Sequence, residues 1–144
     1  MALHVFHTAT THLLIKSPID GLLKHLPVTI TYAHEEEPWS EDLIDYGNEE
    51  DNAKQCRRFE RGLDCCIWIK VTASALGEHG YDSLGGCIIK CDNLEPDGIQ
   101  RQLLELASEH DMKNNACAQL KGNILCSYKL LSEALGCSYT QEVA

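Results

Sequence analysis

Hydrophobic and polar residues alternate in several stretches of the chain, and this pattern predicts β-strands. In "PVTITYAH", Val28 and Ile30 alternate with threonines, which is the period of two expected when one face of a strand is buried. The mixed apolar and β-branched run over residues 3–15 predicts one strand or a bent pair of strands. Residues 65–76 and 87–91 predict two further strands, joined as a hairpin through the glycine-rich loop "GEHGYDSLGG".

Other stretches carry the start and stop signals of helices. In "SPIDGLLKHLP", Ser17 is a suitable N-cap, Pro18 suits the first helical position and Pro27 blocks continuation, which predicts a short amphipathic helix. "NAKQCRRFERG" predicts a basic helix with one buried face. Apolar residues at helical spacing predict two C-terminal helices, over residues 96–110 and 114–136. The apolar stripe of the last helix comprises Cys117, Leu120, Ile124, Tyr128, Leu131 and Leu135.

Together these elements predict an α+β fold, a small, mainly antiparallel sheet packed by two C-terminal helices and short N-terminal helices. A chain of 144 residues, 44% of them hydrophobic, is long enough for one domain with an ordinary core and too short for two comfortable ones. We therefore expect residues 1–144 to form a single domain, with an acidic loop or short helix at residues 35–51.

Several classes of protein are disfavoured by composition. The longest uninterrupted apolar run, residues 65–69, is far shorter than the roughly 20 residues of a membrane helix. The N-terminus does not read as a signal peptide, because histidines and threonines interrupt its apolar residues. We therefore expect a cytoplasmic protein without a membrane partner, with its eight cysteines as reduced thiols. The formal charge of −10 disfavours direct nucleic-acid binding.

The strongest compositional break is the acidic stretch "EEEPWSEDLIDYGNEED", residues 35–51, which contains no lysine or arginine. Within it, Ser40 could cap a short turn of helix that ends at Gly47. A surface of this kind would attract a protein partner with a basic surface and could imitate DNA. The candidate partner-binding residues are Glu35, Glu36, Glu37, Trp39, Glu41, Asp42, Asp45, Tyr46, Glu49, Glu50 and Asp51.

The simpler interpretation of the acidic stretch is a solvated loop, because runs of like charge are usually solvated. Its charges could also pair within the chain with Arg57, Arg58 and Arg61, which follow in the basic helix. Both interpretations remain open from the sequence.

The cysteines and histidines do not form a convincing metal site. On a strand, Cys87 and Cys91 would lie about 13 Å apart, too far for both thiolates to come within about 2.3 Å of one zinc ion. On a strand, His4 and His7 would face opposite sides, and His34 lies in a run of glutamates that is expected to be solvated. We expect core cysteines, no metal and no cofactor.

Two further hypotheses concern residues 64–92. The loop residues Glu78, His79, Asp82 and Ser83, with Cys66 or Cys87 nearby, could serve a small enzyme or a ligand-binding protein. In a third hypothesis the protein is a homo-oligomer. The apolar second face of the hairpin, which carries Trp68, Cys66 and Leu76, must then be covered by a helix or by another copy of the chain.

The strand "CIWIKVTASA", a glycine-containing turn and "YDSLGGCIIKCDN" followed by an acidic helix resemble small accessory proteins of bacteriophages and other mobile elements. The resemblance covers residues 60–110. It implies a non-enzymatic factor that acts on another protein and transfers no catalytic or ligand residue. Combined with the acidic stretch, it suggests an inhibitor of a host nucleic-acid-handling or defence protein, of the anti-CRISPR or anti-restriction type.

Overall fold

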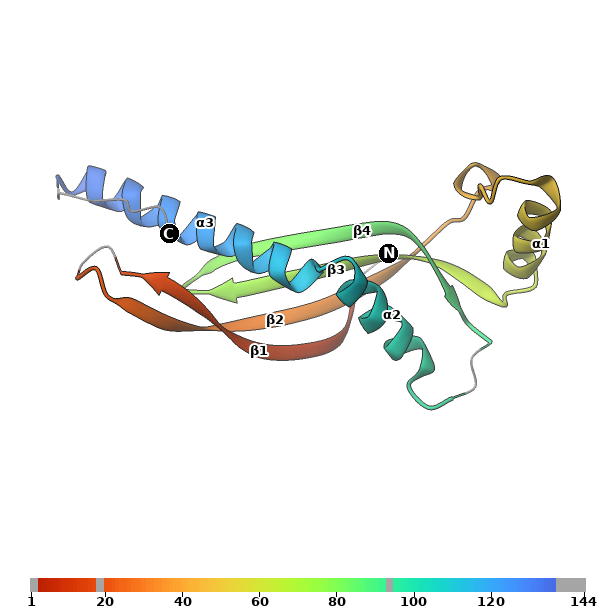
Figure 1. Ribbon diagram of the computed structural model, residues 1–144, viewed down its shortest axis with the longest axis horizontal. Coiled ribbons are helices and arrows are strands. Elements are labelled where there is room, and N and C mark those ends of the chain that lie inside the picture. Colours follow the sequence, from red (N-terminus) through yellow and green to blue (C-terminus); the bar gives the residue numbers. More distant parts are fainter. Residues whose placement is uncertain (1–2, 18–19, 93–94, 137–144) are drawn as a thin grey trace. The chain divides into compact units, whose positions relative to one another are not determined.

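The computed structural model describes residues 3–17, 20–92 and 95–136. They form a four-stranded antiparallel sheet in the order β1-β2-β3-β4, together with helices that include two at the C-terminal end (Figure 1). The predicted α+β fold is confirmed. The elements are β1 (His4–Lys16), β2 (Leu23–Glu37), the 3-10 turn η1 (Glu41–Leu43), α1 (Glu49–Glu60), β3 (Asp64–Ala75), β4 (Glu78–Lys90), α2 (Gly98–Glu109) and α3 (Met112–Ala134).

The chain divides into two compact units, and each strand contributes one part to each of them. Unit 1 comprises residues 1–6, 32–70 and 83–110, and therefore contains η1, α1 and α2. Unit 2 comprises residues 7–31, 71–82 and 111–144 and contains α3.

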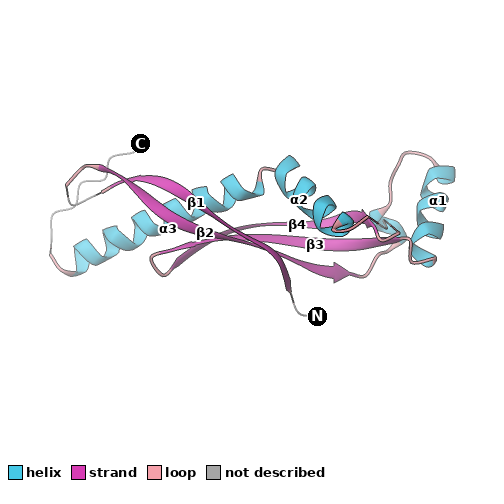
Figure 2. Ribbon diagram, turned by 90° about the horizontal axis from the view of Figure 1, so that it is seen from below, coloured by secondary structure: helices cyan, strands magenta, loops and turns pink. Residues whose placement is uncertain are grey.

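In unit 1 the sheet buries side chains on both faces. Ile67 and Ile69 of β3 and Ile89 of β4 are buried on one face, and α2, which lies beside the sheet (Figure 2), buries Leu103 and Ala107. Cys66 and Ile88, which directly precede Ile67 and Ile89 in the sequence, point to the opposite face and pack in a smaller core of their own. The other members of this smaller core are Ile44, Phe59, Trp39 and Cys56.

In unit 2 the strands alternate strictly. Val28 and Ile30 of β2 and Val71 and Ala73 of β3 are buried, whereas the threonines and serine between them are more exposed. The buried residues of α3 complete this core. They are Met112, Ala116, Cys117, Leu120 and Ile124.

The predicted helix over residues 17–27 is wrong, because Leu23 already begins β2 and Asp20 lies in a turn before it. Ser17 donates its backbone N–H to the carbonyl of Leu22 at 2.8 Å, and Asp20 Oδ1 accepts the Leu22 N–H at 3.0 Å. Gly21 adopts a φ of +69°. Pairing of β1 with β2 therefore overrides the local helix signals. Pro18, to which one of those signals was assigned, lies outside the described residues.

The predicted long loop over residues 77–86 is also wrong, since β4 begins at Glu78. The hairpin closes through Leu76 and Gly77, with φ angles of 53° and 74°, as a two-residue turn of the type I′ class requires. Gly80 allows α3 to lie directly against β4, because a Cβ atom there would overlap backbone atoms of Ala116 and Leu120. Gly77 and Gly80 therefore serve a hairpin turn and a close helix contact, respectively.

The expectation that all cysteines are reduced fails at one pair. Cys65 and Cys91 are joined by a disulfide, with their Cα atoms 6.4 Å apart. The antiparallel pairing of β3 with the end of β4 brings them together, as the hydrogen bond from the Cys91 N–H to the Leu63 carbonyl shows. Because strand register is not encoded locally, the expectation of eight reduced thiols did not include this cross-strand pairing. Cys56, Cys66, Cys87, Cys117 and Cys126 are free thiols.

Candidate partner-binding surface

The acidic stretch is built into the secondary structure of unit 1. Its first three glutamates are the last residues of β2, Glu41 and Asp42 belong to η1, and the final three acids form the first turn of α1 (Figure 1). The predicted short helix after Ser40 is thus a 3-10 turn, and Ser40 makes no capping side-chain hydrogen bond. The exposed carboxylates, here called the acidic surface, belong to Glu36, Glu41, Asp42, Asp45, Glu49, Glu50 and Asp51.

Two hydrogen bonds hold the segment between η1 and α1 against α1. Asn52 of α1 accepts the backbone N–H of Tyr46 at 2.8 Å, and the Tyr46 hydroxyl donates to Gln55 Oε1 at 3.1 Å. Between η1 and α1 lies a shallow cavity of about 500 Å³, on whose rim Glu41 and Glu49 both lie. The acids of η1 and of the first turn of α1 therefore share one surface, although several residues separate them in the sequence.

Part of the acidic charge serves local structure. Asn48 caps α1 by accepting the Asp51 N–H at 2.8 Å, and acids in the first turn oppose the positive end of the helix dipole. Asp45 Oδ1 accepts the Gly47 N–H at 3.1 Å. Half-buried Glu37 accepts the Gly86 N–H at 3.1 Å and lies 3.8 Å from the Cys66 sulfur.

The remaining acids have no such role. Glu36, Glu41 and Asp42 are exposed, and within residues 3–17, 20–92 and 95–136 none of these three takes part in a side-chain hydrogen bond or an ion pair. Glu49 and Glu50 likewise make no side-chain hydrogen bond or ion pair among the described residues, but they lie in the first turn of α1, where they favour the helix dipole.

The two candidate aromatic anchors differ. Trp39 is half-buried and stacks on Phe59, with ring centroids 4.9 Å apart and planes 12° apart, so it packs the smaller core of unit 1. Tyr46 is 52% exposed and can meet a partner. Glu35, the remaining candidate, is half-buried at the end of β2.

The basic helix does not neutralise the acidic surface through Arg58. Its guanidinium forms a bidentate pair with buried Asp64, through Nε at 2.8 Å and Nη2 at 2.9 Å. Burial by itself would raise the pKa of Asp64, but the hydrogen bonds from Arg58 and Gln55 outweigh it and lower that pKa. Arg58 therefore holds α1 against the start of β3, while Arg57 lines the shallow cavity and Arg61 is exposed.

The two cysteines named for an enzyme around residues 64–92 are buried thiols. Burial raises the pKa of the Cys66 thiol, and burial together with the neighbouring Cys66 and Glu37 raises the pKa of Cys87 to about 11. Thiols of this kind are almost entirely protonated at neutral pH and react slowly.

The histidine and the polar groups of β4 are engaged elsewhere, in unit 2. His79 Nδ1 lies 2.9 Å from Ser74 Oγ, and Asp82 Oδ2 accepts the Asn115 side chain at 3.0 Å. Ser83, the last of the named residues, is exposed on β4 in unit 1.

Histidine rings gather on β1 and β2 without forming a metal centre. In unit 1 the rings of His4 and His34 lie 5.9 Å apart, and His34 also contacts Phe6. Desolvation and the nearby His4 lower the pKa of His34, whose Nδ1 is buried without a hydrogen-bond partner. In the part of the chain that the structure describes, no group of three or more His, Cys, Asp or Glu side chains could hold a metal ion.

One pocket was missed by the sequence analysis. It lies in unit 2 between the β3–β4 turn and α3, with Leu76 and Glu78 on one side and Ile124, Ser127, Tyr128 and Leu131 on the other. The sequence placed three of these residues on one helix stripe and Glu78 in a loop. Only the tight hairpin turn, which was not predicted, brings Glu78 to the helix.

Neither a protein-family model, nor a curated protein sequence, nor a solved structure matches this chain. Among the described residues, no helix has the length and hydropathy needed to cross a membrane.

Proposed function

We propose that this protein is a non-enzymatic binding factor that uses its acidic surface to occupy a basic surface on a protein partner. The carrying observation is the exposure of Glu36, Glu41 and Asp42 without a structural contact that would explain them. Surfaces of one charge sign attract complementary surfaces and accelerate association.

The partner class follows from this chemistry. A protein that handles nucleic acid presents arginines and lysines to phosphates, and a rigidly held row of carboxylates can replace those phosphates. Acids held by a strand end, a 3-10 turn and a helix lose less conformational entropy on binding than acids in an unstructured loop. Inhibition of a host nucleic-acid-handling or defence protein, of the anti-CRISPR or anti-restriction type, is the activity that we propose for such a contact.

Tyr46 is the aromatic group best placed to contribute. It is exposed beside the acidic surface, and its ring is held through the hydroxyl contact to Gln55. Aromatic residues of this kind are enriched among the residues that dominate binding energy. Trp39 is proposed only as a structural support for η1, because its ring is stacked on Phe59.

The test is a capture experiment from bacterial lysate with two matched triple variants. The first carries Glu36→Gln, Glu41→Gln and Asp42→Asn. The control carries Glu105→Gln, Glu109→Gln and Glu133→Gln, three exposed glutamates of α2 and α3. Both variants change the net charge equally, so any difference between them reports position rather than total charge.

The proposal predicts a nucleic-acid-binding partner that the wild type and the control variant retain at low salt. It should be released by about 0.5 M salt, by excess duplex DNA and by the first variant. Equal retention by both variants, or a partner that DNA does not displace, would contradict the proposed mode of binding.

A further inference from the structure

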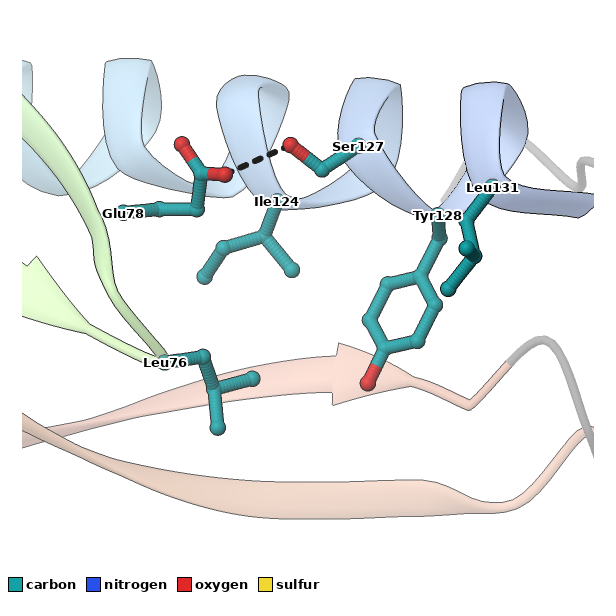
Figure 3. Close-up of a pocket in the computed structure, with 6 residues that line it drawn as sticks. All are labelled: Leu76, Glu78, Ile124, Ser127, Tyr128 and Leu131. Carbon is teal, nitrogen blue, oxygen red and sulfur yellow. Dashed lines mark hydrogen bonds between the residues drawn. The ribbon is translucent and has the colours of Figure 1, made fainter. Parts of the chain in front are cut away.

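The pocket of unit 2 has the composition of a small ligand site. Figure 3 shows Ile124, Tyr128 and Leu131 descending from successive turns of α3, with Leu76 facing them from the β3–β4 turn. Its cavity volume is about 170 Å³. Apolar cavities of about 150 Å³ accept a benzene molecule, so this pocket has room for one six-membered ring or a short branched chain.

A bound ligand would bury apolar side-chain surface that the pocket now exposes to water. Leu76 and Leu131 are 63% and 56% exposed, although Ile124 between them is buried. An apolar group seated here would remove leucine surface from water, which is the main favourable contribution to binding in sites of this kind.

A single carboxylate gives the pocket its polarity. Glu78 is half-buried at the pocket, and its Oε1 accepts a hydrogen bond from the Ser127 hydroxyl at 2.6 Å (Figure 3). Within the described ranges no cation pairs with Glu78. The serine fixes the orientation of the carboxylate, while the adjoining apolar side chains weaken the screening of its charge by water.

We propose that this pocket binds a small organic ammonium ion whose apolar body is about the size of one aromatic ring. The ammonium group would pair with Glu78, and the ring would lie among Leu76, Tyr128 and Leu131. A cation can also be attracted by the face of the Tyr128 ring. The pocket belongs to unit 2 and shares no residue with the acidic surface, so the inference does not depend on the proposed function.

Titration followed by amide NMR spectra tests the inference with three ligands of nearly equal shape. They are phenethylamine, the neutral 2-phenylethanol and the anionic phenylacetate. We expect saturable shifts at pocket residues for the amine, with about tenfold weaker binding of the alcohol and no binding of phenylacetate up to about 10 mM.

Variants separate charge from shape. Glu78→Gln keeps an acceptor for Ser127, and it should weaken amine binding about tenfold while leaving the alcohol nearly unchanged. Leu131→Ala should weaken both ligands severalfold, and Glu109→Gln, an exposed control that does not line the pocket, should change neither. Absence of saturable amine binding, equal binding of phenylacetate, or unchanged amine affinity in Glu78→Gln would overturn the inference.

Discussion

The two units use the same four strands in different ways. In unit 1 the sheet is buried on both faces, since Ile67 and Ile69 belong to one core and Cys66 to another. In unit 2 the strands alternate between buried and more exposed residues, and Val71 and Ala73 face a single core. Burial on both faces requires cover on each, and α1, which covers the second face, carries Glu49, Glu50 and Asp51 of the acidic surface in its first turn.

In unit 1, α1 and the segment before it cover the second face of the sheet, where Phe59 and Ile44 pack with Cys66. The docking of α1 buries the Asp64 carboxylate, and its desolvation costs free energy. Hydrogen bonds from Arg58 and Gln55 offset that cost. In unit 2 the backbone of β4 instead lies directly against the backbone of α3 at Gly80. Substitutions at Asp64 and at Gly80 can therefore distinguish a helix held by a buried ion pair from one held by close backbone packing.

The largest effect is expected at Gly80. Gly80→Ala would place a methyl group against the backbone of α3, which cannot move without displacing the core residues Ala116 and Leu120. We expect a loss of about 3 kcal/mol in the free energy of unfolding, measured by urea denaturation. The control is Gly122→Ala, an open position on α3, which should gain about 0.5–1 kcal/mol. Equal effects of the two substitutions would contradict the close helix contact.

The second largest effect on stability is expected at Asp64, which Arg58 and Gln55 hold in unit 1. Asp64→Ala leaves the Arg58 guanidinium and the Gln55 amide without their buried acceptor, and we expect a loss of about 2–3 kcal/mol in the free energy of unfolding. Asp92→Ala removes the exposed, 3.4 Å contact of the same arginine and should cost less than about 0.5 kcal/mol. A similar cost for both variants would show that Asp64 is not the anchor of α1.

The third prediction is that buried Cys87 is alkylated more slowly than exposed Cys126. With its pKa raised to about 11, Cys87 has about one thiolate in 10⁴ molecules at pH 7, and its reaction with iodoacetamide should accelerate as the pH rises toward that value. Exposed Cys126 on α3 should be alkylated first in the native protein, as mass spectrometry of peptides can show. Rapid alkylation of Cys87 at pH 7 would contradict its burial.

The smallest effect is a pH dependence from His34. Its pKa is lowered below 6.5 in the folded state, so the unfolded chain takes up a proton first, and the stability falls as the pH drops below about 6.5. His34→Gln should reduce this loss, measured as the change in the urea midpoint between pH 7 and pH 5.5. Asp64 acts in the same direction but only below about pH 4, because its lowered pKa departs from a usual value of 3.8. An unchanged pH dependence in His34→Gln would show that another group is responsible.

Strand and helix periodicity was enough to predict most of the fold. The period of two around Val28 and Ile30 and the stripe of α3 both persist in the structure, because long, strongly patterned segments fix which side is buried. The change within β3, from the continuous apolar run around Ile67 to alternation at Val71, was also present in the sequence. It marks where the sheet becomes buried on both faces.

The failures have a common physical cause, which is pairing between distant segments. The helix signals around Ser17 lost to strand pairing, and the glycines around Gly80 served a helix contact that no local pattern encodes. The disulfide of Cys65 with Cys91 likewise depends on strand register. For the candidate site, the sequence predicted the acidic residues that are exposed. It did not predict that Trp39 stacks on Phe59 in the smaller core of unit 1.

We propose Glu36, Glu41 and Asp42 as the binding acids because they are exposed and make no side-chain hydrogen bond or ion pair within the described ranges. The most direct measurement is the dissociation constant of the captured partner against salt concentration, for the wild type and the two matched triple variants. We expect the acidic-surface variant to bind more weakly than the control and its affinity to depend less steeply on salt. Coincident salt dependences for the two variants would contradict the claim, because the attraction would then come from total charge alone.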